Sequence, residues 1–148
     1  MTLPVLLDVN VWLALVLSKH VHHDAARRWF EGVDNRDAIL FCRVTQQAFL
    51  RLLTNAAVLA PYGNLPLSDS EAWSVFDRLA ADPRIALRVD EPVGTAGLWR
   101  ELTERDTSST KLWMDAYLAA FAIAADHGLV TTDGAFQQFS ALDLVVIA

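Results

Sequence analysis

Cysteine is almost absent from this chain of 148 residues, since Cys42 is the only one. A single cysteine excludes an intrachain disulfide and any metal site that needs several thiolates. It also fits a reducing compartment, where disulfides are rare. Because free cysteines are among the most buried residues, we expect Cys42 to be a buried and unreactive thiol.

Long apolar runs are lacking as well. The longest, residues 116–125 with Tyr117 inside it, falls well short of the roughly 20 residues that a membrane span needs. The N-terminus begins directly with a strand-like run and has neither the basic flank nor the small-residue cleavage site of a signal peptide. We therefore expect a cytoplasmic protein without a membrane segment.

Basic residues are too few for a wide nucleic-acid-binding face. Twelve Lys and Arg against eighteen Asp and Glu give a formal net charge of −6, which argues against binding through a broad basic surface. A nuclease is still compatible with this charge, because a cation bound by clustered carboxylates reverses the local potential. The six glycines are scattered, so there is no glycine-rich phosphate loop, and no serine nucleophile elbow is present.

The sequence does contain an alternation of short apolar runs and longer amphipathic segments. Hydrophobic residues make up 53% of the chain, and its length fits a single domain, residues 1–148. The alternation is typical of βα units around a parallel sheet. Strands are expected at 3–7, 38–41, 85–89, 129–132 and 143–147. Helices are expected at 11–17, 24–31, about 46–55, 68–81, 92–104 and 112–127, with a surface loop at 60–66.

Three aspartates occupy related places in this pattern. Asp8 closes the first apolar run, Asp133 closes the run 129–132, and Asp115 opens an apolar helical stretch. If the two runs are neighbouring parallel strands, the three carboxylates gather at one edge of the sheet, where open α/β folds keep their ligands. Crowded carboxylates repel each other unless they are protonated or share a divalent cation. The pattern therefore indicates a metal site, and Mg²⁺ suits oxygen ligands of this kind.

Each aspartate also has a purely structural interpretation. Asp8 can cap the helix that follows, Asp115 can be an ordinary first-turn residue, and Asp133 can form the turn before Gly134. Asn10, two residues after Asp8, either orients a carboxylate or a metal-bound water, or is a simple cap. The sequence leaves these alternatives open.

Other polar residues are weaker candidates. Thr131 and Thr132 either contribute hydroxyls to the site or are ordinary β-branched strand residues. His20, His22 and His23 form a tight group, and imidazole is a common metal ligand. We do not expect these histidines to bind a metal, because adjacent side chains diverge and no cysteine or acidic triad accompanies them.

Several segments resemble a known family. Leu6–Leu15 (LLDVNVWLAL), Trp113–Ala120 (WMDAYLAA) and Val130–Asp133 (VTTD) resemble the PIN-domain ribonucleases. More narrowly, they are similar to the VapC toxins of bacterial toxin–antitoxin pairs. The resemblance extends over nearly the whole chain, because His22-His23 before a helix, RVTQ at 43–46 and FLRLLTN at 49–55 also match one VapC subgroup.

This resemblance implies a three-layer α/β/α domain with a central, mostly parallel sheet of about five strands. It implies Mg²⁺ or Mn²⁺ held by acidic residues, endonucleolytic cleavage of RNA, a homodimer, and silencing by a cognate VapB-type antitoxin that fills the active-site groove. Asp8 and Asp115 match the positions of the metal ligands, and Asp133 matches the third acidic position.

The chain departs from the family at one position. The family commonly carries a Glu in the helix after the second strand, where this chain has Thr45-Gln46-Gln47-Ala48-Phe49. Gln46 or Gln47 can offer a neutral oxygen, with Gln47 as the candidate at the site. Removing one negative charge should weaken cation binding. Either activity persists with three acids, or a group such as Asp24 or Glu71 compensates.

The leading hypothesis is a metal-dependent endoribonuclease in which Asp8 and Asp115 hold the cation and Asp133 helps to place the attacking water. The candidate contacts to RNA phosphates are Arg43, Arg51, Arg100, Arg105 and Lys111. Trp113 either stacks on a base or has a core or interface role. One alternative is a catalytically degenerate PIN module that binds RNA or protein without cutting. The other is a phosphotransfer receiver domain, although the adjacent acids that it needs after the first strand are missing.

Overall fold

Short apolar runs form a five-stranded sheet in the computed structural model, which describes residues 3–148. The strands lie in the order β3-β2-β1-β4-β5, and every neighbouring pair is parallel. They are β1 (Val5–Leu7), β2 (Ile39–Cys42), β3 (Ile85–Arg88), β4 (Gly128–Thr131) and β5 (Asp143–Val146). Since all strands point the same way, their carboxyl ends share one edge of the sheet, as the aspartate pattern requires.

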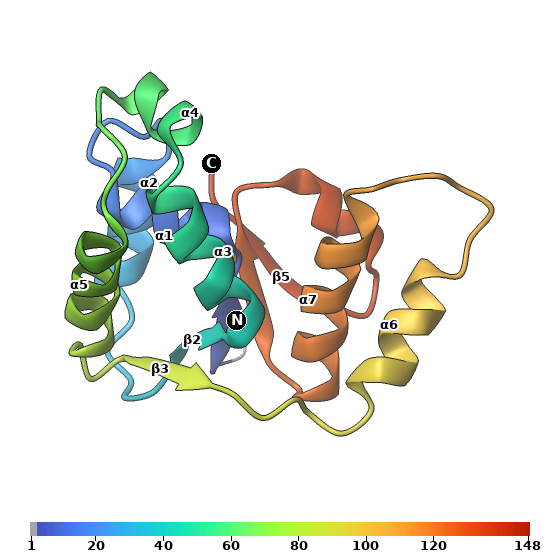
Figure 1. Ribbon diagram of the computed structural model, residues 1–148. Coiled ribbons are helices and arrows are strands. Elements are labelled where there is room, and N and C mark those ends of the chain that lie inside the picture. The colour runs from blue at the N-terminus through green and yellow to red at the C-terminus, as the bar shows by residue number, and fades with distance from the viewer. Residues whose placement is uncertain (1–2) are drawn as a thin grey trace.

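Helices connect the strands and cover both faces of the sheet (Figure 1). The elements are α1 (Val9–Val16), α2 (His23–Glu31), α3 (Arg43–Leu53), α4 (Ala56–Leu59), the 3₁₀ helix η1 (Ala60–Tyr62), α5 (Asp69–Ala80), α6 (Thr95–Thr103), α7 (Leu112–Ala124) and the 3₁₀ helix η2 (Gly134–Gln138). Helices α1 to α5 pack on one face, whereas α6 and α7 lie on the other. The expected three-layer α/β/α architecture is confirmed. None of these helices within residues 3–148 is long and apolar enough to cross a bilayer.

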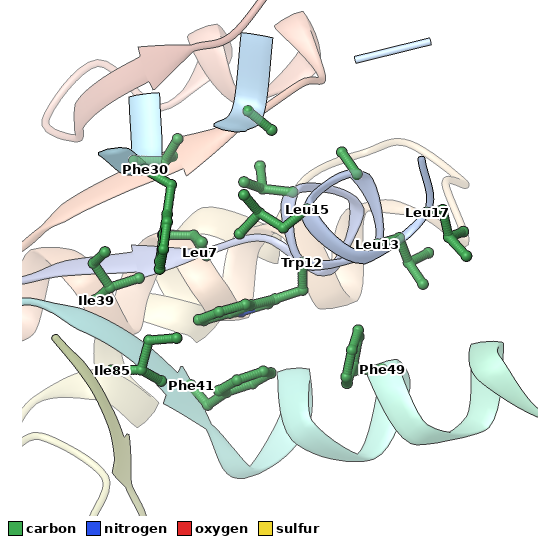
Figure 2. Packing of buried hydrophobic residues seen from close by; sticks show 14 of the residues in the cluster. Leu7, Trp12, Leu13, Leu15, Leu17, Phe30, Ile39, Phe41, Phe49 and Ile85 are labelled. Carbon is green, nitrogen blue, oxygen red and sulfur yellow. The ribbon is translucent and has the colours of Figure 1, made fainter. Parts of the chain in front are cut away.

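Alternating side chains of each strand supply two separate cores. Val5 and Leu7 of β1 join the core under α1 to α5, whereas Leu6 between them joins the core under α7. All three are fully buried, as expected of a parallel sheet with helices on both faces. In the first core the Trp12 indole stacks on the Phe41 ring, with centroids 3.7 Å apart (Figure 2). This stack packs α1 against β2.

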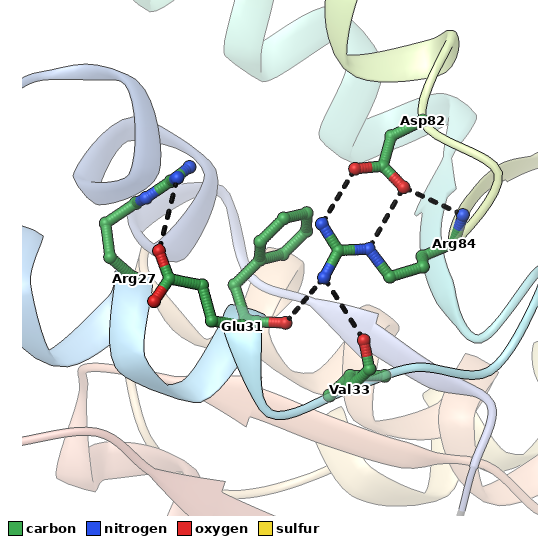
Figure 3. A network of polar contacts seen from close by, with 6 residues as sticks. Arg27, Glu31, Val33, Asp82 and Arg84 are labelled. Carbon is green, nitrogen blue, oxygen red and sulfur yellow. Dashed lines mark hydrogen bonds and ion pairs between the residues drawn. The ribbon is translucent and has the colours of Figure 1, made fainter.

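A polar network joins the start of β3 to the end of α2 (Figure 3). The Arg84 guanidinium donates to both carboxylate oxygens of Asp82, and its Nη1 donates to the carbonyl oxygens of Phe30 and Val33 at 3.1 and 3.2 Å. It also lies 4.0 Å from the centroid of the Phe30 ring. Through the Arg84 hydrogen bond, the network lowers the pKa of the Asp82 carboxyl. These contacts fix the turn that brings β3 alongside β2.

Some helix boundaries differ from the sequence-based predictions. The helix expected from Pro92 begins at Thr95, because the Thr95 amide and hydroxyl both bond to the Pro92 carbonyl and make a tight turn first. The segment 60–66, expected as a loop, opens with η1, which follows a short helix capped by the Asn55 side chain. The 3₁₀ helix η2 was not predicted. These short elements lack the amphipathic periodicity by which longer helices are recognised.

Candidate active site

The two central strands bring two of the aspartates together. β1 pairs with β4 in parallel, with Leu7 opposite Val130. Asp8 directly follows β1, and its amide donates to the Val130 carbonyl at 2.9 Å. Asp133 lies two residues beyond the end of β4. Both carboxylates therefore stand at the carboxyl edge of the sheet, as predicted.

The Asp8 carboxylate is held from two sides. Its Oδ1 accepts from the Val9 amide at 2.8 Å, so Asp8 does cap α1. Its Oδ2 accepts from the Thr131 hydroxyl at 2.8 Å. Burial raises the pKa of Asp8, and the two hydrogen bonds act against that rise. Asp8 can therefore cap α1 and also belong to the predicted metal site, because one carboxylate can accept several hydrogen bonds.

Thr131 links the ends of the two strands. It is fully buried, donates its hydroxyl hydrogen to Asp8, and accepts from the Asp133 amide at 3.0 Å through the same oxygen. Thr132, the other predicted hydroxyl candidate, is half-buried and makes no hydrogen bond to an aspartate within residues 3–148. The hydroxyl that reaches the site therefore belongs to Thr131, because side chains alternate along a strand.

Asp115 reaches the same edge from the first turn of α7. Burial raises the pKa of Asp115 to about 6, and the charges of Asp8 and Asp133 add to this rise. The Lys111 ammonium opposes it. Mutual repulsion of this kind requires carboxylates that are close together and only partly screened by solvent. The three aspartates thus form one electrostatically coupled group.

Lys111 supplies the positive charge of this group. Its Nζ forms a close ion pair with Oδ2 of Asp133 and lies 3.9 Å from Oδ2 of Asp115. The hydrogen bond from Lys111 is the largest cause of the lowered pKa of Asp133, whose Oδ1 meanwhile accepts from the Ala135 amide at 2.9 Å. Lys111 was predicted to contact RNA, and its contacts in the structure are with the aspartates.

The donor set suits a hard divalent cation. Carboxylate oxygens are ligands that such cations prefer, and the three aspartates bring negative charge to one edge of the sheet. Within residues 3–148, however, no three acidic, histidine or cysteine side chains converge closely enough to share one ion. The Lys111 ammonium stands between Asp115 and Asp133 instead. The residues fit a cation site whose positive charge is at present provided by a lysine.

A polar hollow opens beside Lys111 and Asp115. It is lined by Arg105, Thr107, Ser109, Lys111, Leu112, Asp115, Ala135 and Gln138. The Arg105 guanidinium is oriented by bonds to Oε1 of Gln138 at 2.8 Å and to the Leu102 carbonyl at 3.1 Å. Cationic and hydroxyl groups next to an acidic cluster form a surface that can receive a phosphate group.

The other predicted site residues are not gathered with the aspartates. Asn10 and Gln47 are exposed, and neither bonds to an aspartate within residues 3–148. Gln46 is the buried glutamine, and its Oε1 accepts from Arg43 at 2.5 Å. Arg51 lies at the other end of α3, over a separate hollow. Of the predicted RNA contacts, Lys111 and Arg105 adjoin the acidic group.

The proposed substitutes for the missing family Glu are also elsewhere. Glu71 caps α5, where its Oε1 accepts from the Ser68 amide at 3.0 Å. Asp24 is exposed in the first turn of α2. Neither carboxylate contacts Asp8, Asp115 or Asp133 within residues 3–148, so the structure lends no support to compensation by either one.

The histidine group and the lone cysteine have structural contacts. His23 Nδ1 lies 2.6 Å from the Ala14 carbonyl, and His20 stacks on Tyr62 with centroids 5.0 Å apart. No metal-binding group involves the histidines within residues 3–148. Cys42 is buried, as expected, and its Sγ lies 3.6 Å from the Thr45 hydroxyl.

An apolar hollow adjoins the site on the α6 and α7 side. It is lined by Val44, Trp99, Trp113, Met114 and Tyr117. Trp113 is 56% exposed, so the core role considered for it is wrong. Its carbonyl accepts from Trp99 Nε1 at 2.8 Å, which fixes the two indoles near each other.

The fold defines the class of protein. The family described as "PIN domain" matches residues 5–142. A solved structure, VapBC2 from Rickettsia felis bound to a DNA fragment from their promoter, superposes with a TM-score of 0.67 at 17% identity, covering 97% of this chain and 98% of that chain. At this identity the likeness concerns the fold alone. The receiver-domain alternative is therefore wrong.

Two named relatives show which group of PIN-domain proteins this chain belongs to. Ribonuclease VapC41 of Mycobacterium tuberculosis is 48% identical over 143 residues, covering 97% of this chain and 98% of the relative. Ribonuclease VapC44 of the same species is 34% identical over 129 residues, covering 86% of this chain and 84% of the relative. The chain therefore belongs to the VapC group of the PIN-domain family.

Proposed function

We propose that this chain is a divalent-metal-dependent endoribonuclease and acts as the toxin of a type II toxin–antitoxin pair. The observation that carries the proposal is the placement of Asp8 and Asp133 at one edge of the sheet, where both bond to Thr131, with the Lys111 ammonium lying between Asp133 and Asp115. The similarity to proteins named Ribonuclease VapC41 and VapC44 supports RNA as the substrate class. The alternative of a module that binds without cutting has no specific support in the site.

Asp8 and Asp115 would hold Mg²⁺, or Mn²⁺ in its place, with Asp133 completing the site. When bound, such a cation activates a water and neutralises charge on the phosphoryl group. The Thr131 hydroxyl keeps the Asp8 carboxylate in one orientation. Asp133 would help to orient the attacking water, and Arg105 would contact the RNA phosphate from the polar hollow.

RNA cleavage with purified protein tests the proposal. We expect cleavage with Mg²⁺ or Mn²⁺, loss of cleavage on adding EDTA, and at least a hundredfold loss in Asp8→Asn and Asp115→Asn, in line with the effect of removing a group that stabilises charge in a transition state, roughly 10²–10³. Asp24→Asn is the matched control, because it removes an exposed carboxylate from a helical first turn. If RNA cleavage continues in the presence of EDTA and is undiminished in both Asp8→Asn and Asp115→Asn, the proposal is wrong.

The partners are proposed on the same basis. VapBC complexes occur among the structures that share this fold, which supports a VapB-type antitoxin as the protein partner. The family resemblance supports a homodimer. We further propose that the protein acts in the cytoplasm, where cellular RNA is available to it.

A further inference from the structure

Lys111 is placed where a bound cation would compete with it. It directly precedes α7, four residues before Asp115, so its side chain and that of Asp115 lie on one side of the first helical turn. Its ammonium also reaches across to Asp133, beyond the end of β4. A single lysine thus bridges an acidic residue of the helix and one of the sheet edge.

Lys111 lies against one carboxylate oxygen of each of two aspartates in the proposed cation site. Oδ1 of Asp133 is engaged with the Ala135 amide, and Oδ2 carries the Lys111 ion pair. On Asp115 the nearer oxygen to the ammonium is likewise Oδ2. An ammonium and a divalent cation carry like charges, so each disfavours the other at these carboxylates at close range. A cation that binds there would therefore tend to displace the ammonium.

Lys111 has space into which to move. Its side chain is 62% exposed, and it lines the polar hollow that also contains Arg105 and Ser109. A rotation of the long, flexible lysine stem would move the ammonium away from Asp133 toward the Arg105 side of this hollow. There it would stand beside Arg105, whose position is fixed by Gln138.

We propose that Lys111 is a displaceable counter-ion: its ammonium neutralises Asp115 and Asp133 in the metal-free protein, is displaced by the divalent cation, and then contacts the RNA phosphate. The inference rests on the proposed function, because it assumes that a cation binds at these aspartates. Lys111 would thus lower the affinity for the metal and raise the affinity for RNA.

The test compares Lys111→Met with wild type in two separate measurements. The first is Mn²⁺ binding without RNA, by titration calorimetry or by electron paramagnetic resonance of free Mn²⁺. We expect Mn²⁺ to bind roughly threefold to tenfold more tightly to Lys111→Met, a modest change because the lost competitor is exposed and screened. The second is RNA cleavage at saturating Mn²⁺, where we expect a KM raised by roughly threefold to tenfold.

Two variants serve as controls, one for the Lys→Met substitution itself and one for the charge at position 111. The chain contains one other lysine, Lys19, which is exposed between α1 and α2. Lys19→Met makes the same substitution and should leave Mn²⁺ affinity unchanged. Lys111→Arg keeps the charge and should restore Mn²⁺ affinity to within about twofold of wild type. Thermal unfolding of each variant checks that the fold is retained.

The outcomes separate this inference from the proposed function. Unchanged or weaker Mn²⁺ binding in Lys111→Met would overturn the counter-ion role, and an unchanged KM would overturn the phosphate contact. If wild type binds Mn²⁺ without cutting RNA, the proposed function fails while the binding comparison still decides the counter-ion role. If neither protein binds Mn²⁺, both proposals fail.

Discussion

The Thr131 hydroxyl contacts two of the three aspartates, donating to Asp8 and accepting from the Asp133 amide. Thr131→Val keeps the shape but leaves the buried Asp8 carboxylate short of a donor. We expect a loss of about 1–3 kcal/mol in the free energy of unfolding, the usual penalty for a buried group left unsatisfied, measured by urea denaturation. Thr132→Val is the matched control, and an equal loss there would contradict this role for Thr131.

The raised pKa of Asp115 predicts that the free energy of unfolding of the metal-free protein depends on pH. Its pKa is raised from 3.8 to about 6, so the folded state holds this proton more tightly than the unfolded state does. The resulting stabilisation is complete below about pH 4 and is lost as the pH rises through 6. At pH 7, Asp115→Asn should therefore be more stable than wild type by about 1–2 kcal/mol, allowing for solvent screening.

Urea denaturation at pH 4 and pH 7 checks this prediction. The advantage of Asp115→Asn should appear at pH 7 and vanish at pH 4. An Asp115→Asn protein that is less stable at pH 7 would mean that the ion pair with Lys111 outweighs burial and repulsion.

The aspartates could be identified from the sequence, but their partners could not. Asp8 and Asp133 each follow an apolar run, so a parallel sheet alone predicts that they meet. Lys111 stands four residues before Asp115, and that helical spacing is the signal that could have indicated their pairing. The choice of Thr131 over Thr132 needs the strand's exact end, which apolar patterning locates only to within a residue or two.

At the scale of elements, Arg84 connects α2 to the start of β3. Arg84→Met should lower the free energy of unfolding by about 2–3 kcal/mol, because it removes charge-assisted bonds to Asp82 and to two carbonyls. Arg36→Met, which removes an arginine from an exposed pair, should change it by less than about 0.5 kcal/mol. Equal urea midpoints for the two variants would show that the network contributes little.

Strands were easier to predict than short helices. The runs at 85–89 and 143–147 match β3 and β5 to within one residue, although these edge strands are only partly buried and include the charged residues Arg88 and Asp143. By contrast, α4 and η2 depend on single side-chain caps, from Asn55 and Asp133 respectively. A cap satisfies only a few backbone groups, so it leaves little trace in composition.

At the scale of the whole molecule, we expect a homodimer. Gel filtration with light scattering should give about twice the chain mass of 16.4 kDa at micromolar concentration. Adding a cognate antitoxin should increase the mass further and abolish RNA cleavage. A monomer under these conditions would contradict the dimer, and undiminished cleavage in the complex would contradict inhibition through the active site.

The pairing of β1 with β4 has a consequence for a chain still on the ribosome. Thr131, to which Asp8 bonds, is synthesised 123 positions after it. Until β4 has emerged, the nascent polypeptide has neither that hydroxyl nor Asp133. An unfinished copy should therefore be harmless to the cell that is translating it.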